Sequence, residues 1–124
     1  MTRELDAAIV RGLEYILREQ DGEYSVVRWA DSELYIEALP HYSSDGNDML
    51  ELDGEMRERG WYITNLCYFS VDKLWECKYE HYKAEGRKKV VHFTDGEAGG
   101  HADTMPKAVA LATYKALSGE EWTE

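Results

Sequence analysis

The chain has 124 residues, of which 44 % are hydrophobic and 12 % aromatic. This composition is typical of one globular domain and excludes a disordered chain, and the two cysteines are too few for a disulfide-rich scaffold. The formal net charge of -11 disfavours direct binding to nucleic-acid phosphates and leaves two interpretations open, a soluble surface or a decoy for a basic one.

The first predicted element is a helix near the amino terminus. Apolar residues recur at spacings of three and four from Leu5 to Leu17, which is helical periodicity. Asp21-Gly22 is expected to end this helix. The next segment, 22–39, is predicted to be irregular or partly strand, in which 24–29 could form a short strand and 32–39 a helical turn before Pro40.

A second helix is predicted from about Asn47 to Arg59. Either Ser44 or Asp45 can cap it by accepting hydrogen bonds from its free backbone amides. Gly60 is placed to end it in the left-handed conformation.

Three antiparallel strands are predicted next, at 61–70, 74–82 and 88–94, from period-two alternation rich in aromatic residues. A three-residue connection at 71–73 would set Phe69 opposite Trp75 and Cys67 opposite Cys77, with the apolar positions on one face.

The carboxyl-terminal part is predicted as a flexible, turn-rich loop at 95–100 followed by a helix that begins near Thr104. Pro106 suits the first turn of that helix, and Gly119 ends it. The predicted fold is α+β: a single domain at 1–118, with a three-stranded meander, about three helices in the order α-α-β-β-β-α, and a frayed acidic tail at 119–124.

Two stretches resemble a known family. The turn Pro40-His41-Tyr42-Ser43-Ser44-Asp45 before a helix that ends Arg57-Glu58-Arg59-Gly60-Trp61 is similar to the opening of the phage ABA-sandwich domain proteins. The run Ala102-Asp103-Thr104-Met105-Pro106-Lys107-Ala108 resembles that family's last helix start. The resemblance implies a small phage or prophage accessory protein with helices around an antiparallel sheet, no established activity and no catalytic residues. We expect a host-cytoplasmic location, since no signal peptide or membrane-length apolar run is seen.

Residues with chemical potential have simple structural explanations beside the functional ones. His101 and Asp103, with His92 before them, could form a metal or acid–base site, but no spacing typical of a metal site supports ligation. Cys67 and Cys77 could form a cross-strand disulfide, a soft metal site or a pair of buried thiols. The sequence therefore predicts no catalytic residue, no metal and no cofactor.

Two sets of candidate binding residues remain. Two helix amino termini, near Ser44 and Thr104, are natural anion sites, and basic side chains could serve as counter-charges if they converge there. The ligand-binding candidates are Ser44, Arg57, Arg87, Thr104 and Lys107. Exposed aromatics could anchor a partner, and two strand glutamates could mimic spaced phosphates. The partner-binding candidates are Trp29, Tyr35, Tyr42, Glu76 and Glu80.

These observations favour a non-enzymatic phage accessory protein that binds and inhibits a host protein, plausibly a nucleic-acid-binding defence factor, in the manner of an anti-CRISPR inhibitor. The alternatives are a binder that sequesters a phosphorylated nucleotide signal and a small hydrolase that uses His92, His101 and Asp103. A homodimer formed through an exposed sheet edge is also compatible with the pattern.

Overall fold

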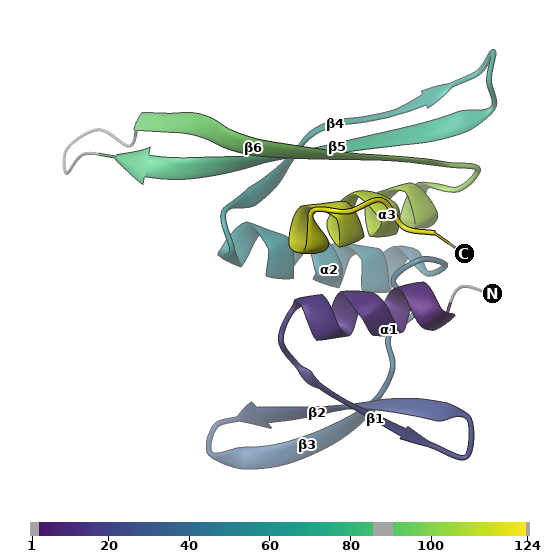
Figure 1. Cartoon of the computed structure of the whole chain (residues 1–124), viewed down its shortest axis with the longest axis vertical. Helices are drawn as coiled ribbons and strands as arrows, with labels where there is room; N and C mark the ends of the chain where they lie inside the picture. The colour runs from purple at the N-terminus through teal and green to yellow at the C-terminus, as the bar shows by residue number, and fades with distance from the viewer. Residues whose placement is uncertain (1–2, 86–90, 124) are drawn as a thin grey trace.

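The protein is described by a computed structural model that covers residues 3–85 and 91–123. A layer of helices lies between two antiparallel three-stranded sheets, β1-β2-β3 and β4-β5-β6 (Figure 1). The elements are α1 (Arg3–Gly12), β1 (Ile16–Gln20), β2 (Glu23–Ala30), β3 (Glu33–Ala38), α2 (Gly46–Glu58), β4 (Trp61–Phe69), β5 (Leu74–Glu85), β6 (Val91–Ala102) and α3 (Met105–Ser118). The α+β class and the meander β4-β5-β6 are confirmed, whereas the sheet β1-β2-β3 adds three strands to the predicted order.

The first sheet occupies the end of the predicted first helix and the segment expected to be irregular. α1 stops at Gly12, and Glu14 has a positive φ of 68°, which breaks the helical path before Leu17. Asp21-Gly22 and Asp31-Ser32 each form a two-residue hairpin loop with φ positive at both positions, the type I′ geometry that suits twisted strands. Asp21-Gly22 therefore joins two strands instead of ending a helix, and the predicted helical turn at 32–39 was wrong.

A buried polar cluster links α1 to residues 39–43, the segment that follows the first sheet. One guanidinium nitrogen of Arg3 donates to the buried carboxylate of Asp6 at 2.9 Å, and the other donates to the Leu39 carbonyl at 2.7 Å. The Ser43 N–H donates to the second Asp6 oxygen at 3.0 Å. Burial raises the pKa of Asp6, although the hydrogen bonds from Ser43 and the charge of Arg3 act in the opposite direction. We call Arg3, Asp6, Leu39 and Ser43 the polar latch.

The second predicted helix is confirmed almost residue for residue as α2. The Asp45 side chain caps it by accepting from the backbone N–H groups of Asn47 at 2.8 Å and Asp48 at 3.0 Å. Asp45, rather than Ser44, is thus the N-cap. Gly60 has a φ of 85°, the left-handed conformation expected after the last turn.

The core fills the space between the helices and the inner faces of both sheets. α3 packs on β5 and β6, α2 packs on β4, and α1 packs on α3 and β1. The largest fully buried apolar side chains come from every layer: Tyr42, Tyr79, Leu5, Ile9, Leu39, Leu52, Met56, Val10, Val26 and Val109. Since Val26 belongs to β2, the inner face of the first sheet is part of the same core.

The β4–β5 hairpin is shifted by one residue from the predicted register. Phe69 lies opposite Leu74, not opposite Trp75, because the connection holds residues 70–73. Lys73 adopts a positive φ of 54° at the end of this longer turn.

The shift places the two cysteines on opposite faces. Cys67 lies opposite Glu76 on the outer face, whereas the fully buried Cys77 lies on the inner face. A register shift between Ile63 and Asn65 changes which residues of β4 face inward, from odd-numbered to even-numbered positions. One strand can therefore present apolar residues inward at both of its ends. The predicted cross-strand pairing of the cysteines was wrong, and both are free thiols.

The segment predicted as a loop at 95–100 is part of strand β6. The third predicted strand, 88–94, begins outside the described residues, and its part from Val91 onward belongs to β6. At position 100 only glycine fits without displacement, because a Cβ there would lie 2.6 Å from the Ala108 carbonyl oxygen and 2.6 Å from the Ala112 backbone nitrogen. The glycine therefore lets α3 approach the sheet backbone closely.

α3 begins after Thr104 and carries Pro106 in its first turn, as predicted. Gly119 ends it with a φ of 77°. Within the described residues, no helix is long and apolar enough to cross a membrane.

The tail was predicted to be frayed but folds back along α3 over residues 119–123 (Figure 1). The Lys115 ammonium lies 2.6 Å from a Glu121 carboxylate oxygen. The rings of Tyr114 and Trp122 meet edge to face with their centroids 5.0 Å apart. Aromatic packing holds this segment, which composition alone did not reveal.

Candidate functional site

The outer face of the first sheet carries a row of apolar side chains that no other part of the described structure covers. Cross-strand partners share a face, as do alternate residues of one strand. The registers align Ile16 with Val27 and Val27 with Ile36, and Trp29 with Leu34. Five residues make up this apolar stripe: Ile16, Val27, Trp29, Leu34 and Ile36. The adjacent residue Val26 points the other way, into the core.

The stripe is open to solvent to an unusual degree for residues of these types. Trp29 is 70 % exposed, Ile16 58 %, Ile36 57 % and Leu34 51 %. Together these four side chains expose about 400 Å² of mostly apolar surface, which is the size of the largest apolar patch on a typical single chain, and such patches are often functional.

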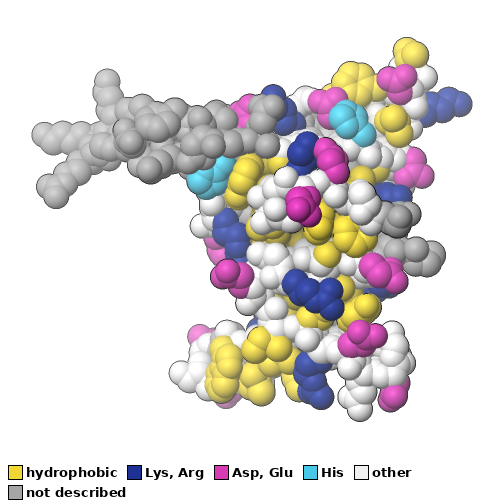
Figure 2. Space-filling view, viewed as in Figure 1, with side chains coloured by type: hydrophobic (Ala, Val, Ile, Leu, Met, Phe, Trp, Pro, Cys, Tyr) yellow, Lys and Arg dark blue, Asp and Glu magenta, His cyan; other side chains and the backbone are white. Residues whose placement is uncertain are grey.

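An acidic rim lies at the two ends of the stripe, with Asp21 and Glu23 at the β1–β2 turn and Asp31 at the β2–β3 turn. Segment 14–38 holds seven acidic side chains and two arginines. The acidic members are Glu14, Glu19, Asp21, Glu23, Asp31, Glu33 and Glu37, all exposed. Of these, Glu19, Glu33 and Glu37 lie on the opposite face with Val26, whereas Arg18 lies on the face of the stripe. Figure 2 shows hydrophobic side chains gathered at the lower end of the molecule, over this sheet, with acidic ones beside them. An apolar centre with a charged border is the usual anatomy of a protein interface.

A second group of exposed apolar side chains lies at the tip of the β4–β5 hairpin. Val71 is 93 % exposed, Tyr68 47 % and Phe69 43 %. Tyr68 and Phe69 are consecutive residues of one strand and so point to opposite faces. The Tyr68 ring already packs against Trp75, with centroids 5.4 Å apart. This tip therefore presents no single flat face comparable to the apolar stripe.

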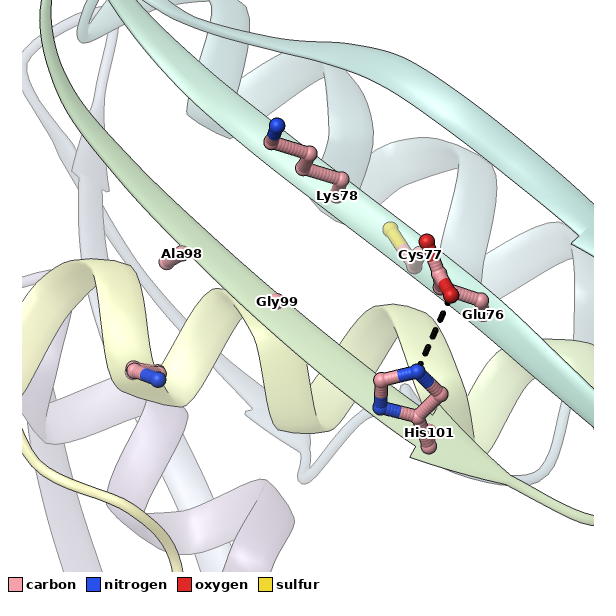
Figure 3. A pocket seen from close by; sticks show the side chains of 7 residues that line it. Glu76, Cys77, Lys78, Ala98, Gly99 and His101 are labelled. Atoms are coloured by element: carbon pink, nitrogen blue, oxygen red, sulfur yellow. Dashed lines mark hydrogen bonds and ion pairs between the residues drawn. The ribbon is translucent and has the colours of Figure 1, made fainter.

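The outer face of the second sheet is polar in its middle. His101 Nε2 lies 3.0 Å from Glu76 Oε2 (Figure 3). The Asn65 amide donates to the other Glu76 oxygen at 2.9 Å, which fixes the carboxylate in place. The Lys78 ammonium lies 3.5 Å from a Glu80 oxygen on the same face. Charged groups on this sheet are thus paired with one another across and along the strands.

A shallow pocket of about 330 Å³ opens beside this polar cluster, lined by Glu76, Lys78, Gly99, His101 and Lys115 among others (Figure 3). A carboxylate–imidazole pair can hold or move a proton, which is the chemistry that general acid–base catalysis uses. His101 is largely exposed, however, and Lys115 is engaged with the tail. In residues 3–85 and 91–123, no group of three or more His, Cys, Asp or Glu side chains is arranged to hold a metal ion.

The predicted ligand residues do not gather at one helix terminus. Arg57 lies in the last turn of α2 and pairs with Asp53 at 3.1 Å, so about 18 Å of helix separates it from Ser44 at the other end. Thr104 is the N-cap residue of α3 but makes no side-chain capping hydrogen bond, and Lys107 lies in the first turn that follows. Arg87 lies outside the described residues.

The predicted partner residues separate into three locations. Trp29 lies in the apolar stripe, and Tyr35, 42 % exposed, lies at the neighbouring position of β3 with its hydroxyl donating to Glu33 at 3.0 Å. Tyr42 is only 1 % exposed, which corrects its expected exposure, and burial raises its pKa to about 12. Glu76 and Glu80 lie on the outer face of the second sheet, as expected for a solvated strand face.

The predicted catalytic grouping is dispersed as well. His92 and His101 lie on the same strand nine residues apart, a separation of about 30 Å in extended chain. His101 has Glu76 as its partner instead, which sequence spacing did not reveal. On the inner face, burial raises the pKa of the Cys77 thiol to about 12, with smaller contributions from Asp53 and Glu76, so this thiol is inert near neutral pH.

Sequence reasoning missed most of the apolar stripe. Ile16 was assigned to a helix, and Leu34 and Ile36 were assigned to a helical turn. The signal that could have found them is Asp21-Gly22, a strong hairpin motif, flanked by alternating residues on both sides.

Comparisons of the chain with protein-family models, with curated proteins and with solved structures found no match. The similarity to the phage ABA-sandwich proteins therefore stays a prediction that rests on the residues quoted for it.

Proposed function

We propose that this chain is a non-enzymatic binding protein that acts by covering a surface of another protein. The observation that carries the proposal is the apolar stripe, in which four large side chains on one sheet face are each more than half exposed. Leaving such side chains in water forgoes roughly 1 kcal/mol or more for each, which contact with a partner recovers.

The phage setting comes from the family resemblance, and in that setting the covered surface would belong to a host component. A defence factor that binds nucleic acid is the partner class we favour, because such proteins expose basic surfaces and this chain carries a net charge of -11. Inhibition would follow from steric occupation of that surface.

Native mass spectrometry of the protein recovered from host lysate tests the proposal. Three forms are compared: the wild type, Trp29→Ser in the apolar stripe, and Leu50→Ser, which removes a 63 % exposed leucine from α2 as a matched control. We expect a protein-sized mass increment on the wild type and on Leu50→Ser that is lost from Trp29→Ser.

Two outcomes contradict the proposal. An increment of a few hundred daltons on all three forms would favour the alternative of a sequestered small molecule. A protein-sized increment that Trp29→Ser leaves unchanged would show that the apolar stripe is not the binding surface.

A further inference from the structure

We infer that the apolar stripe accepts a basic amphipathic helix, with apolar residues on one side and Lys or Arg along its flanks. This inference rests on the proposed function and names the chemistry of the partner. It follows from the width of the sheet face, the area that the stripe offers and the charge of its rim.

The width of the face matches one helix. Three strands at a spacing of about 4.8 Å present a face about 10 Å across, which is close to the diameter of an α-helix. The row Ile16, Val27 and Ile36 spans that width, and Trp29 and Leu34 form the next row along the strands. On the opposite face of the same sheet, α1 already packs against β1, so a second helix would complete a sheet covered on both sides.

The area of the stripe requires the partner to reach beyond it. The roughly 400 Å² that the stripe exposes is about half of the 800 Å² that each side contributes to a standard protein interface. The remaining contact must come from the rim and from the polar side chains of the same face, Asp21, Glu23, Asp31 and Arg18 among them.

The charge of the rim decides which helix fits. One of the two arginines, Arg28, points to the inner side, where its guanidinium lies over the Tyr15 ring at 4.6 Å and 3.6 Å from a Glu37 oxygen. Asp31 at the β2–β3 turn and Asp21 and Glu23 at the β1–β2 turn remain at the two ends of the stripe, and they outnumber Arg18, the basic side chain on this face of the sheet. An acidic helix or a second copy of this chain would bring like charges together there, whereas flanking Lys or Arg would pair with them.

A synthetic peptide tests this chemistry directly. The probe is an amidated Leu/Lys peptide of about 18 residues with helical periodicity, and the control is the Leu/Glu peptide of the same pattern. Affinity is measured by isothermal titration calorimetry at low and physiological salt. We expect the Leu/Lys peptide to bind and the Leu/Glu peptide not to bind at the same concentrations.

Variants separate contact with the stripe from general attraction between opposite charges. Trp29→Ser and Ile36→Ser should each weaken binding of the Leu/Lys peptide by about tenfold, because large side chains at an interface centre dominate affinity. Leu50→Ser should leave the affinity within about twofold. Asp31→Asn with Glu23→Gln should reduce the salt dependence while keeping both turns, since asparagine tolerates the positive φ of Asp31.

Three results would overturn the inference. Equal binding of the Leu/Lys peptide to the wild type and Trp29→Ser would show attraction by charge alone. Equal binding of both peptides to the wild type would remove the requirement for basic flanks. A wild-type dimer in sedimentation that Trp29→Ser dissociates would show that a second copy covers the stripe. If lysate capture still depends on Trp29 in the last two cases, protein binding through the stripe stands and only the chemistry of the partner is wrong.

Discussion

The two sheets of this protein differ in the side chains on their outer faces, which are polar and paired in the second sheet and apolar and exposed in the first. In the second sheet the polar side chains of the outer face pair with one another. Asn65 donates to Glu76, Glu76 contacts His101, and Lys78 lies near Glu80. In the first sheet the outer face leaves Trp29 and its apolar neighbours open to water. Helices pack on the inner faces of both sheets, α1 against β1 of the first sheet and α2 and α3 against the second (Figure 1). The first sheet, and not the second, therefore has an outer face of apolar side chains that a further element could cover.

The difference in solvent access between the inner and outer faces of the second sheet can be measured first, through the alkylation rates of its two cysteines. Cys67 is partly exposed on the outer face of β4, whereas Cys77 is fully buried with its pKa raised to about 12. We expect iodoacetamide at pH 8 to modify Cys67 at least about 100-fold faster than Cys77. Peptide mass spectrometry after timed quenching gives the two rates, and both should become equal in denaturant. Comparable rates in the native protein would place Cys77 at the surface and contradict the described sheet.

The close packing of α3 on the inner face of the second sheet depends on Gly100. In Gly100→Ala the new methyl group would meet two backbone atoms of α3 at 2.6 Å, so either the helix or the strand must move. We expect a loss of about 3 kcal/mol in the free energy of unfolding, the upper end for overpacking, because backbone cannot rotate away. Urea unfolding followed by circular dichroism measures it.

Gly54→Ala is the matched control for that experiment. A Cβ at Gly54 meets nothing within 4 Å, and the position lies inside α2. We expect this change to stabilise the protein by roughly 0.5–1 kcal/mol, since alanine has less conformational entropy to lose than glycine. A Gly100→Ala variant as stable as the wild type would indicate that α3 does not approach β6 as closely as described.

The polar latch joins the first sheet to the rest of the molecule, and its strength should depend on pH. Arg3→Met removes a charge that lowers the pKa of the buried Asp6 carboxyl, so that pKa, already raised in the folded state, rises further. A raised folded-state pKa gives stability that is complete below the unfolded value and is lost as pH increases through the folded value. We therefore expect Arg3→Met to cost about 2 kcal/mol near neutral pH and less at pH 4.

The double variant with Asp6→Asn tests that reasoning. Without an ionisable group at position 6, the cost of Arg3→Met should no longer increase between pH 4 and pH 7, because the linked titration is gone. Thermal unfolding of the four forms at several pH values completes the cycle. An unchanged pH dependence in the double variant would assign the effect to another group.

The parts of this fold that the sequence predicts are those with local signals. The cap at Asp45, the stop at Gly60 and the proline in the first turn of α3 each act within one helical turn, and all three are confirmed. The alternation of β4 and β5 likewise predicted the meander. Its exact register depended on the length of one turn and on one bulge, neither of which leaves a pattern in composition.

The parts that the sequence did not predict depend on contacts between distant residues. Apolar spacing from Leu5 to Leu17 fits a helix as well as a helix followed by a strand, and the chain takes the second course because it turns at Glu14 and pairs Leu17 with Val26 of β2. Glycines 96, 99 and 100 suggest a loop by propensity, yet close packing of α3 requires one of them inside a strand. The pairing of His101 with Glu76 spans 25 residues and needs the register to be known.

The smallest expected effect is also the sharpest test of the contrast between the sheets. If the apolar stripe serves a partner and not the fold, Trp29→Ser should change the free energy of unfolding by less than about 0.5 kcal/mol, because a side chain that is 70 % exposed contributes little packing. The same substitution should abolish partner binding, so stability and binding separate at this residue. A loss of stability of 2 kcal/mol or more would mean that Trp29 packs within the chain, as Trp75 does against Tyr68, and both sheets would then be complete without a partner.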